Sequence, residues 1–453
     1  MVPPASNPPR RILLRATAVI IMFVAVVAAL VAAAVAPYYL SAHVPQTPLL
    51  ALTALVSFGV IAWLGMRISA ALWRTDKAAR FASISASALT LLFFIALYFM
   101  ILRPIPLRYT DAIPAENDKY WHLPTGSTVS YQELLPPSNI AVKPDPIVFL
   151  HGGPGVRFMP WDSSIYGAFA ADGFRVYLYD QAGSGASALL PHSKDYTIER
   201  FVEDLEAVRL QLHADRMILI GHSWGSMLAA SYMAKYPTRV SKVVFHSPGP
   251  IWPGASSTLQ LDAADMGRTD FRGGSLALSD IPFRLLAGLF LLERNPDAAD
   301  YLLPQRQAQE LMVPVILETK GTVVCKGNSS KLPPLFAGIK DHSANPGFNP
   351  YVNERLTDQT QSAQGDPHAA LRGNRTPAIL LFGECNFVPW GGAVDYRNTF
   401  ANLKIFYIPH AGHYIQFEQP EQMSNVMRNF LLGEPDAIPP YTGDADPRAP
   451  GTN

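Results

Sequence analysis

The sequence predicts an α/β protein, with a mainly parallel sheet covered by helices on both faces, preceded by three transmembrane helices. Three observations predict this architecture. Short apolar runs alternate with helical patterns after residue 145, the apolar excess lies before residue 103, and a sharp turn motif joins a predicted strand to a predicted helix. Of the 453 residues, 49% are hydrophobic and 16% are charged, against about 25% charged in an ordinary soluble domain.

Charge and cysteine content exclude several classes of protein. The 36 basic and 36 acidic side chains cancel, so there is no electrostatic basis for binding nucleic acid. Two cysteines are too few for a disulfide framework, and no Cys/His cluster has the spacing of a zinc site. We therefore expect a globular protein without a nucleic-acid partner.

The apolar excess forms three uncharged stretches, at about residues 16–40, 49–66 and 81–102. As helices they would reach roughly 37, 27 and 33 Å, against a hydrocarbon core of about 30 Å. A cleaved signal peptide is the alternative for the first stretch, because three arginines precede it. Two further apolar stretches follow at once, which favours a three-helix membrane anchor over residues 1–102.

Basic residues orient the predicted spans. They cluster before the first span and after the second, at Arg10, Arg11, Arg15, Arg67, Arg74, Lys77 and Arg80. The segment Ser41–Pro48 between these two spans has no Lys or Arg. The positive-inside rule therefore predicts a cytoplasmic N-terminus and places the chain after residue 102 on the outer side of the cytoplasmic membrane.

The remaining chain is predicted to form one large domain with an insertion. We expect a linker and edge hairpin at 103–145, core halves at 146–250 and 376–433, a helical cap at 251–375 and a disordered tail at 434–453. Apolar runs predict strands at Pro146–Leu150, Phe174–Tyr179, Met217–Ile220, Val240–Phe245, Ala378–Phe382 and Leu403–Ile408. Helical patterns such as Ile198–His213 lie between them. The cap is inferred because about 125 residues without this alternation are too many for a loop.

Ser223 is the candidate nucleophile. It is the centre of Gly221-His222-Ser223-Trp224-Gly225, directly after one predicted strand and directly before a helical pattern. A serine at such a sharp turn is strained and exposed, and small flanking residues let the backbone pass closely. The N-terminus of the following helix favours the negative charge of an acyl-transfer transition state.

A glycine-rich turn supplies the candidate oxyanion hole. His151-Gly152-Gly153-Pro154-Gly155 follows the first core strand, and such a turn occurs in many α/β proteins without any catalytic role. Beside Ser223, however, backbone N–H groups of Gly152 or Gly153 and of Trp224 could stabilise a substrate oxyanion. We expect these three residues to form that hole.

The candidate base follows the last strand. In the chain order serine, acid, histidine, His413 of Pro409-His410-Ala411-Gly412-His413 is the expected base, and His410 is the alternative.

The acid position is anomalous. An aspartate is expected after Ala378–Phe382, but Asn386 stands there. An amide oxygen can orient an imidazole but cannot neutralise an imidazolium. Three alternatives stay open: Asn386 suffices in a slower enzyme, Glu384 or Asp395 supplies the carboxylate, or most activity has been lost.

These motifs resemble the proline iminopeptidase branch of the α/β-hydrolase family, which includes related tripeptidyl aminopeptidases. The similar blocks are 151–155, Asp180-Gln181-Ala182-Gly183-Ser184-Gly185, 221–226, and Gly412-His413 followed by Glu418-Gln419-Pro420. The resemblance covers about Tyr120 to Leu432. It implies an α/β-hydrolase fold with a helical cap, Ser223 as nucleophile, His413 as base and the oxyanion amides named above. The three N-terminal spans lie outside the family's usual soluble pattern.

The sequence departs from that family in places. Ala182 stands where an arginine is usual, and Asn386 occupies the acid position. No aromatic-plus-glutamate motif for holding a substrate's free amine is found. The glutamates of the cap segment, expected on solvated helix faces, are Glu293, Glu310, Glu318 and Glu354.

The two cysteines allow two arrangements. Cys325 lies in the cap segment and Cys385 lies beside the acid position. In an oxidising compartment they could form a bridge, and otherwise they are two isolated thiols.

The sequence thus predicts a membrane-anchored serine hydrolase that needs no metal or organic cofactor. We expect an aminopeptidase-like enzyme that cleaves short peptides through an acyl-enzyme. An esterase or lipase is the first alternative. A catalytically weak receptor or interaction protein on the same fold is the second.

Overall fold

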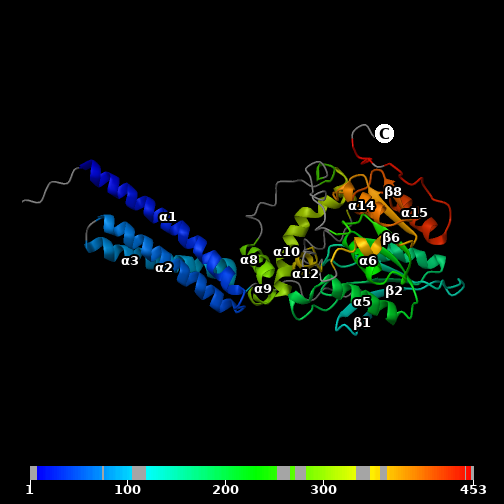
Figure 1. Ribbon diagram of the computed structural model, residues 1–453, viewed down its shortest axis with the longest axis horizontal. Coiled ribbons are helices and arrows are strands. Elements are labelled where there is room, and N and C mark those ends of the chain that lie inside the picture. The colour runs from blue at the N-terminus through cyan, green and yellow to red at the C-terminus, as the bar shows by residue number, and fades with distance from the viewer. Residues whose placement is uncertain are drawn as a thin grey trace, which may run out of the picture. The chain divides into compact units, whose positions relative to one another are not determined.

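The computed structural model describes residues 8–73, 76–104, 119–252, 266–270, 282–332, 347–357, 365–443 and 445–449. The chain divides into two compact units (Figure 1). The helical unit comprises Met1–Pro106 and Ile281–Pro304, and the hydrolase unit comprises Leu107–Asp280 and Gln305–Asn453.

Three long helices dominate the helical unit: α1 (Pro8–Ser41), α2 (Thr47–Trp73) and α3 (Asp76–Leu97), which continues as the π-helical turn η1 (Tyr98–Leu102). They are long and apolar enough to cross a membrane over Ile12–Ser41, Thr47–Trp73 and Lys77–Leu102. The predicted apolar helices are confirmed. Each helix is longer than the uncharged stretch that predicted it. A charged residue such as Arg67 ends the stretch that can lie in the hydrocarbon core, but it does not end the helix.

Two helices from the predicted cap segment complete this unit, α8 (Phe283–Arg294) and α9 (Pro296–Leu302). They bury an apolar face that includes Leu285, Leu292 and Ala298. They contact the ends of the long helices, through α1 and η1 for α8 and through α2 for α9. Part of the segment expected to form one cap therefore packs with the N-terminal helices.

The hydrolase unit is built on one eight-stranded sheet, in the order β1-β2-β4-β3-β5-β6-β7-β8. The strands are β1 (Lys119–His122), β2 (Thr128–Leu134), β3 (Ile147–Leu150), β4 (Val176–Tyr179), β5 (Met217–His222), β6 (Val240–His246), β7 (Ala378–Gly383) and β8 (Leu403–Ile408). Strand β2 is antiparallel to both of its neighbours, β1 and β4, and all other neighbouring strands are parallel. The predicted α/β class is confirmed.

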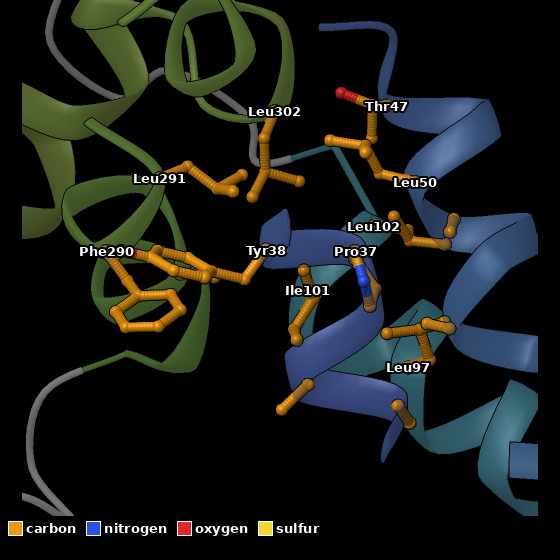
Figure 2. A pocket seen from close by; sticks show the side chains of 15 residues that line it. Pro37, Tyr38, Thr47, Leu50, Leu97, Ile101, Leu102, Phe290, Leu291 and Leu302 are labelled. Atoms are coloured by element: carbon orange, nitrogen blue, oxygen red, sulfur yellow. The ribbon is translucent and has the colours of Figure 1, made fainter. Parts of the chain in front are cut away.

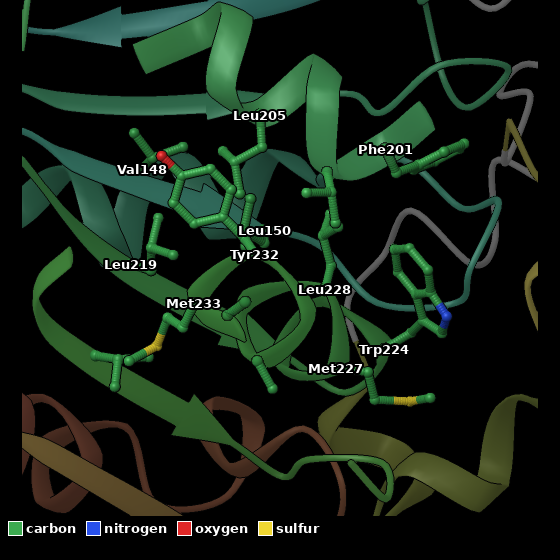
Figure 3. Close-up of a cluster of buried hydrophobic side chains, with 14 of the residues drawn as sticks. Val148, Leu150, Phe201, Leu205, Leu219, Trp224, Met227, Leu228, Tyr232 and Met233 are labelled. Carbon is green, nitrogen blue, oxygen red and sulfur yellow. The ribbon is translucent and has the colours of Figure 1, made fainter. Parts of the chain in front are cut away.

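Helices cover both faces of this sheet. On one face α5 (Ile198–Gln211), α6 (Trp224–Lys235) and α14 (Trp390–Thr399) share a core with the strands, and Figure 3 shows α6 side chains such as Leu228 packed in this cluster. On the other face α4 (Pro160–Gly167) and α15 (Pro420–Leu432) share a second core. The two cores hold the sheet rigid beneath the strand ends where the candidate site lies.

Shorter elements complete the hydrolase unit. The cap segment contributes α10 (Gln305–Thr319), η7 (Lys320–Val323), η8 (Ser329–Lys331), α12 (Pro350–Thr357) and α13 (His368–Leu371). Single 3₁₀ turns are η2 (Ala168–Asp172), η3 (Ser193–Asp195) and η10 (Ile415–Phe417).

The C-terminal tail differs from expectation. Its Pro, Gly and Asp content predicts disorder, yet Tyr441 forms an antiparallel bridge with Ile405 at the edge strand. The guanidinium of Arg448 lies 5.2 Å from the ring centroid of Phe382 and donates to the carbonyl of Asn386 at 3.0 Å. A backbone bridge at Tyr441 and the side chain of Arg448 thus anchor the described part of the tail to the hydrolase unit.

Candidate active site

Ser223 lies at the sharp turn between β5 and α6. Its φ of +53° is strained for a residue with a side chain. The flanking glycines are sterically required: a Cβ on Gly225 would lie 2.0 Å from the carbonyl oxygen of Leu150, and one on Gly221 would lie 2.5 Å from that of Gly225. The small residues of the motif therefore permit the close backbone contacts that present Ser223 at the end of β5.

The glycine-rich turn after β3 lies against Ser223, since a Cβ on Gly152 would be 2.9 Å from the Cβ of Ser223. The turn is oriented by His151. Its Nε2 accepts from the backbone N–H of Gln181 at 2.9 Å, so its Nδ1 carries the proton and donates to the carbonyl of Gly152 at 3.0 Å. Because a trans peptide directs its N–H opposite to its C=O, the N–H of Gly153 points away from His151.

Burial keeps this orienting imidazole neutral. His151 is buried, and burial lowers the pKa of its side chain to about 4. The neutral ring retains the acceptor nitrogen that Gln181 needs, so the turn keeps its conformation at neutral pH.

His413 and Asn386 form the second half of the site. His413 follows β8 and Asn386 follows β7, and both side chains are buried. Nδ1 of His413 lies 2.8 Å from Oδ1 of Asn386. The structure thus places the residue at the acid position against the predicted base.

The orientation of the Asn386 amide follows from a second contact. The backbone N–H of Val388 donates at 3.1 Å to the same Oδ1 atom, and an N–H group can only donate, so this atom is the amide oxygen. His413 Nδ1 must then carry a proton and donate to it. Nε2 of His413 is left unprotonated, which is the tautomer that a general base requires.

No carboxylate compensates a positive charge on His413 among the side chains that the structure places in contact with it. Burial, with a smaller contribution from His222, holds the pKa of His413 well below its usual value. The ring centroids of His222 and His413 lie 5.0 Å apart, and burial lowers the pKa of His222 to about 4. The base is therefore neutral at pH 7.

The two alternative acids contact other histidines. Oε2 of Glu384 accepts from the backbone N–H of His410 at 2.7 Å. Asp395 contacts Nε2 of His368 at 2.9 Å. Of the three candidate acid positions, only Asn386 contacts His413, so the carboxylate substitution considered from the sequence is not what the structure displays.

The alternative base is poorly placed for catalysis. The side chain of His410 is 83% exposed, whereas His413 is 4% exposed and buried against Asn386. Within the described part of the chain, the hydroxyl of Ser223 makes no hydrogen bond.

A disulfide braces this site. Cys325 of the cap segment is bonded to Cys385, the neighbour of Asn386, across 60 residues of sequence. The buried carboxylate of Glu418 accepts from the backbone N–H of Gly412 at 2.7 Å and from that of Cys325 at 3.2 Å. The loop that carries Asn386 is thus bonded directly to the cap segment, and the loop that carries His413 is joined to the same segment through Glu418.

The cap glutamates do not assemble an amine-binding site within the described residues. Glu293 is exposed on α8, which belongs to the helical unit, and the side chain of Glu318 lies outside the described residues. Glu310 and Glu354 are half-buried and already engaged in other interactions. Around Ser223, among the residues described, no three His, Cys, Asp or Glu side chains converge closely enough to hold a metal ion.

Sequence reasoning missed three positioning groups. The Val388 N–H that fixes Asn386 had a usable signal, because Asn side chains often accept from the backbone two residues later. His151 was noticed only as the first residue of a glycine-rich turn. Glu418 lay in a family-like block, but nothing in the spacing indicated that its carboxylate would be buried beneath the His413 loop.

Comparison with known proteins identifies the family that the sequence matches. A profile of the family described as alpha/beta hydrolase fold matches residues 145–420. A proline iminopeptidase of Heyndrickxia coagulans is 36% identical over 135 residues, covering 28% of this chain and 43% of that protein. A proline iminopeptidase of Neisseria meningitidis is 38% identical over 99 residues, covering 22% and 31%. The chain thus matches less than half the length of these curated relatives.

The crystal structure of a proline iminopeptidase of Mycobacterium smegmatis aligns with a TM-score of 0.46 at 22% identity, covering 70% of this chain and 98% of that one.

Proposed function

We propose, since the chain belongs to the α/β hydrolase fold family, that it is a membrane-anchored serine hydrolase acting through Ser223, His413 and Asn386. The observation that carries this proposal is the double contact of the Asn386 amide oxygen, with Val388 N–H and His413 Nδ1. This contact supports a base whose free nitrogen is Nε2, on the loop that contacts His222 beside Ser223.

The proposed reaction proceeds through an acyl-enzyme. Ser223 Oγ attacks the substrate carbonyl while His413 Nε2 takes its proton, and the backbone N–H groups of Gly153 and Trp224 donate to the oxyanion. The imidazolium returns the proton to the leaving group. Water then attacks the acyl-enzyme with His413 again acting as base, which releases the acid and restores Ser223.

Asn386 orients His413 but does not neutralise it. In serine proteases with an aspartate at this position, replacement by asparagine lowers kcat about 10⁴-fold, where the wrong tautomer results. Here the Val388 contact favours the correct tautomer, so the missing charge is the cost that we expect. A low turnover number with an intact nucleophile follows from this arrangement.

The leading substrate class is a short peptide with a free N-terminus. The support is that the two relatives reported above are named proline iminopeptidases. Esterase or lipase activity is the competing assignment. Amino-acid amides compared with fatty-acyl esters, both with chromogenic leaving groups, separate the two, and faster turnover of the esters would overturn the peptidase assignment.

The site is tested by labelling purified membranes with a fluorophosphonate probe. We expect labelling of wild type and of Ser164→Ala, a control serine exposed on α4, and its loss in Ser223→Ala. Asn386→Asp should label faster, because a carboxylate stabilises the imidazolium. It should also raise the pKa of His413 and so move the acid limb of kcat/KM to higher pH.

The opposite labelling pattern would refute the proposal that the protein is an active hydrolase. Absence of labelling in wild type but its presence in Asn386→Asp would mean that the asparagine has silenced the site. The receptor or interaction role would then replace the hydrolase proposal.

We place the hydrolase unit outside the cytoplasmic membrane. Two observations support this: the basic residues flanking the spans, and the Cys325–Cys385 disulfide, which forms and persists in oxidising compartments. In intact cells, His43→Cys between the first two spans should react with an impermeant maleimide and Ala79→Cys near the start of α3 should not. The reverse pattern would invert the topology.

A further inference from the structure

An apolar cavity of about 200 Å³ lies within the helical unit (Figure 2). It is formed by the C-terminal part of α1, the start of α2, the end of α3 with η1, and the helices α8 and α9. Its lining comprises Ala33, Ala34, Pro37, Tyr38, Thr47, Leu50, Ala51, Ala54, Leu97, Ile101, Leu102, Ala287, Phe290, Leu291 and Leu302. Apart from Thr47 and the hydroxyl of Tyr38, this lining is apolar.

Irregularities of the long helices converge on the cavity. Pro37 lacks an N–H group, so it removes the hydrogen bond that would reach the carbonyl of Ala33 in α1. The π-helical turn η1 ends α3, with Arg103 N–H donating to the carbonyl of Tyr98 at 2.7 Å, and it supplies Ile101 and Leu102 to the lining. Such turns are rare and frequently occur at functional sites.

The edge of the cavity carries aromatic rings and one cation. The rings of Tyr38 and Phe290 pack with centroids 4.5 Å apart. The guanidinium of Arg294 lies 5.6 Å from the ring centroid of Tyr38 and 5.8 Å from that of Tyr39. Arg294 forms no ion pair with a carboxylate among the described residues. Tyrosine and arginine at helix ends are typical of the membrane–water interface.

We propose that this cavity binds one acyl chain of an anionic membrane phospholipid, with the phosphate beside Arg294. The lining helices are those able to cross a membrane, so the bilayer itself supplies the occupant. A cavity of about 200 Å³ exceeds the roughly 150 Å³ that holds a benzene molecule. It is smaller than the roughly 300–1,000 Å³ of a pocket for a whole drug-sized ligand, so it admits part of one chain and leaves the headgroup outside.

The proposal does not depend on Ser223, and its test needs no enzyme activity. The full chain is reconstituted in nanodiscs containing phosphatidylglycerol with a diazirine in its acyl chain, irradiated, and digested for mass spectrometry. We expect labelling concentrated on peptides that contain Leu50, Ile101 or Leu302. Ala51→Phe or Ala34→Phe should fill the cavity and lower that labelling about tenfold, the equivalent of roughly two buried methylenes.

Two controls make the result decisive. Ala28→Phe adds the same ring to an exposed position of α1 outside the cavity and should leave the labelling unchanged. Arg294→Gln should abolish a preference for phosphatidylglycerol over phosphatidylcholine, expected at about threefold for one exposed charge pair.

The proposal is overturned if labelling spreads evenly over the lipid-exposed helix faces, or if Ala51→Phe and Ala34→Phe both keep wild-type labelling. A variant that fails to give a monodisperse protein is set aside, and the other cavity-filling variant decides. Equal labelling by the two phospholipids in wild type would overturn the role of Arg294.

Discussion

The long helices of the helical unit and the hydrolase unit differ in where their largest side chains lie. In the hydrolase unit the largest residues are innermost, with Phe149, Tyr166 and Tyr396 at most 1% exposed. In the helical unit small residues face the neighbouring helices, while Phe23 and Phe81 are 70% and 71% exposed. The small residues buried there include Ala18, Ala29, Ala33, Ala54, Ala62, Gly65, Ala82 and Ala86.

The difference is the one expected if the hydrolase unit folds in water and the helical unit folds in lipid. In water, burying large apolar side chains drives folding, so they occupy the core. In lipid, large apolar side chains lose nothing by facing outward, and helices associate through small residues and interhelical hydrogen bonds. The contrast predicts that perturbations of pH and redox state act on one unit, and that added methyl groups act on the other.

Acid should produce the largest contrast. The hydrolase unit buries His151, His222, His246 and His413, and burial lowers the pKa of the first two to about 4. In the unfolded state a histidine binds a proton near pH 6.5, whereas in the folded state these two bind it only near pH 4. Each therefore lowers the free energy of unfolding by roughly 3 kcal/mol as the pH falls from 6.5 to 4. The buried carboxyl of Asp162, with its pKa raised to about 7, acts in the opposite sense and offsets about one histidine. Burial also holds the pKa of His246 and of His413 well below the usual value, so these two histidines add to the loss of stability in acid.

The helices α1, α2 and α3 contain no histidine. Hydrogen exchange with mass spectrometry should therefore show loss of protection in the hydrolase unit below pH 6.5 while these helices stay protected. Uniform protection of both units down to pH 4 would contradict the contrast.

Reduction of the disulfide should come next. A bridge closing a loop of 60 residues stabilises by about 4 kcal/mol in the chain-entropy model. Both cysteines lie in the hydrolase unit, so Cys325→Ser/Cys385→Ser should lower its thermal midpoint and leave the helical unit unchanged. A reductant should reproduce the effect in wild type but not in the double variant, and the loop bearing Asn386 should lose protection first.

A single methyl group should separate α1 from α2. A Cβ on Gly65 would lie 2.0 Å from the Cβ of Ala25, so Gly65→Ala forces the helices apart at a cost of about 1–3 kcal/mol. The matched control is Gly59→Ala, whose Cβ would meet only the side chain of Thr90, at 3.4 Å. In detergent, Gly65→Ala should lower the midpoint temperature of thermal unfolding, and Gly59→Ala should leave it unchanged. Equal midpoints for the two variants would mean that α1 and α2 are not in close contact.

The smallest effect is expected from an interhelical hydrogen bond. The hydroxyl of Ser69 on α2 donates to the carbonyl of Ala18 on α1 at 2.9 Å. Ser69→Ala should cost about 0.6 kcal/mol, the average for such bonds in membranes. Ser83→Ala removes a hydroxyl that bonds only within its own helix, to Ala79, and serves as the baseline. If Ser69→Ala loses no more stability than Ser83→Ala, the hydrogen bond between Ser69 and Ala18 does not contribute to the packing of α1 and α2.

Much of the sheet could be predicted from the sequence, because strands buried on both faces have continuous apolar runs. All four residues of β4, Val176–Tyr179, are buried, and its predicted run began only two residues earlier. The turn at Ser223 could be predicted because its small neighbours are required by backbone contacts. The chain order of serine, acid and histidine predicted where Asn386 and His413 would lie, but the choice among Asn386, Glu384 and Asp395 stayed open until the structure showed Asn386 in contact with His413.

What could not be predicted depends on contacts between distant segments. Helix α8 has two apolar faces, one with Leu285 and Leu292 buried and one with Phe283 and Phe290 exposed. Periodicity therefore predicts the helix but not its partner. Likewise, Cys325 and Cys385 have Cα atoms 5.1 Å apart, a distance that no local pattern encodes.

The assignment of α8 and α9 to the helical unit has a practical consequence for recombinant expression. Removing residues 1–102, the usual way to make an anchored enzyme soluble, would strip α8 and α9 of α1, α2 and η1, against which they pack. The newly bared faces would include Leu285, Leu291 and Leu302, all buried in the intact chain. The truncated protein would therefore expose an apolar surface on α8 and α9 that promotes aggregation. It would need either detergent or polar substitutions on these two helices.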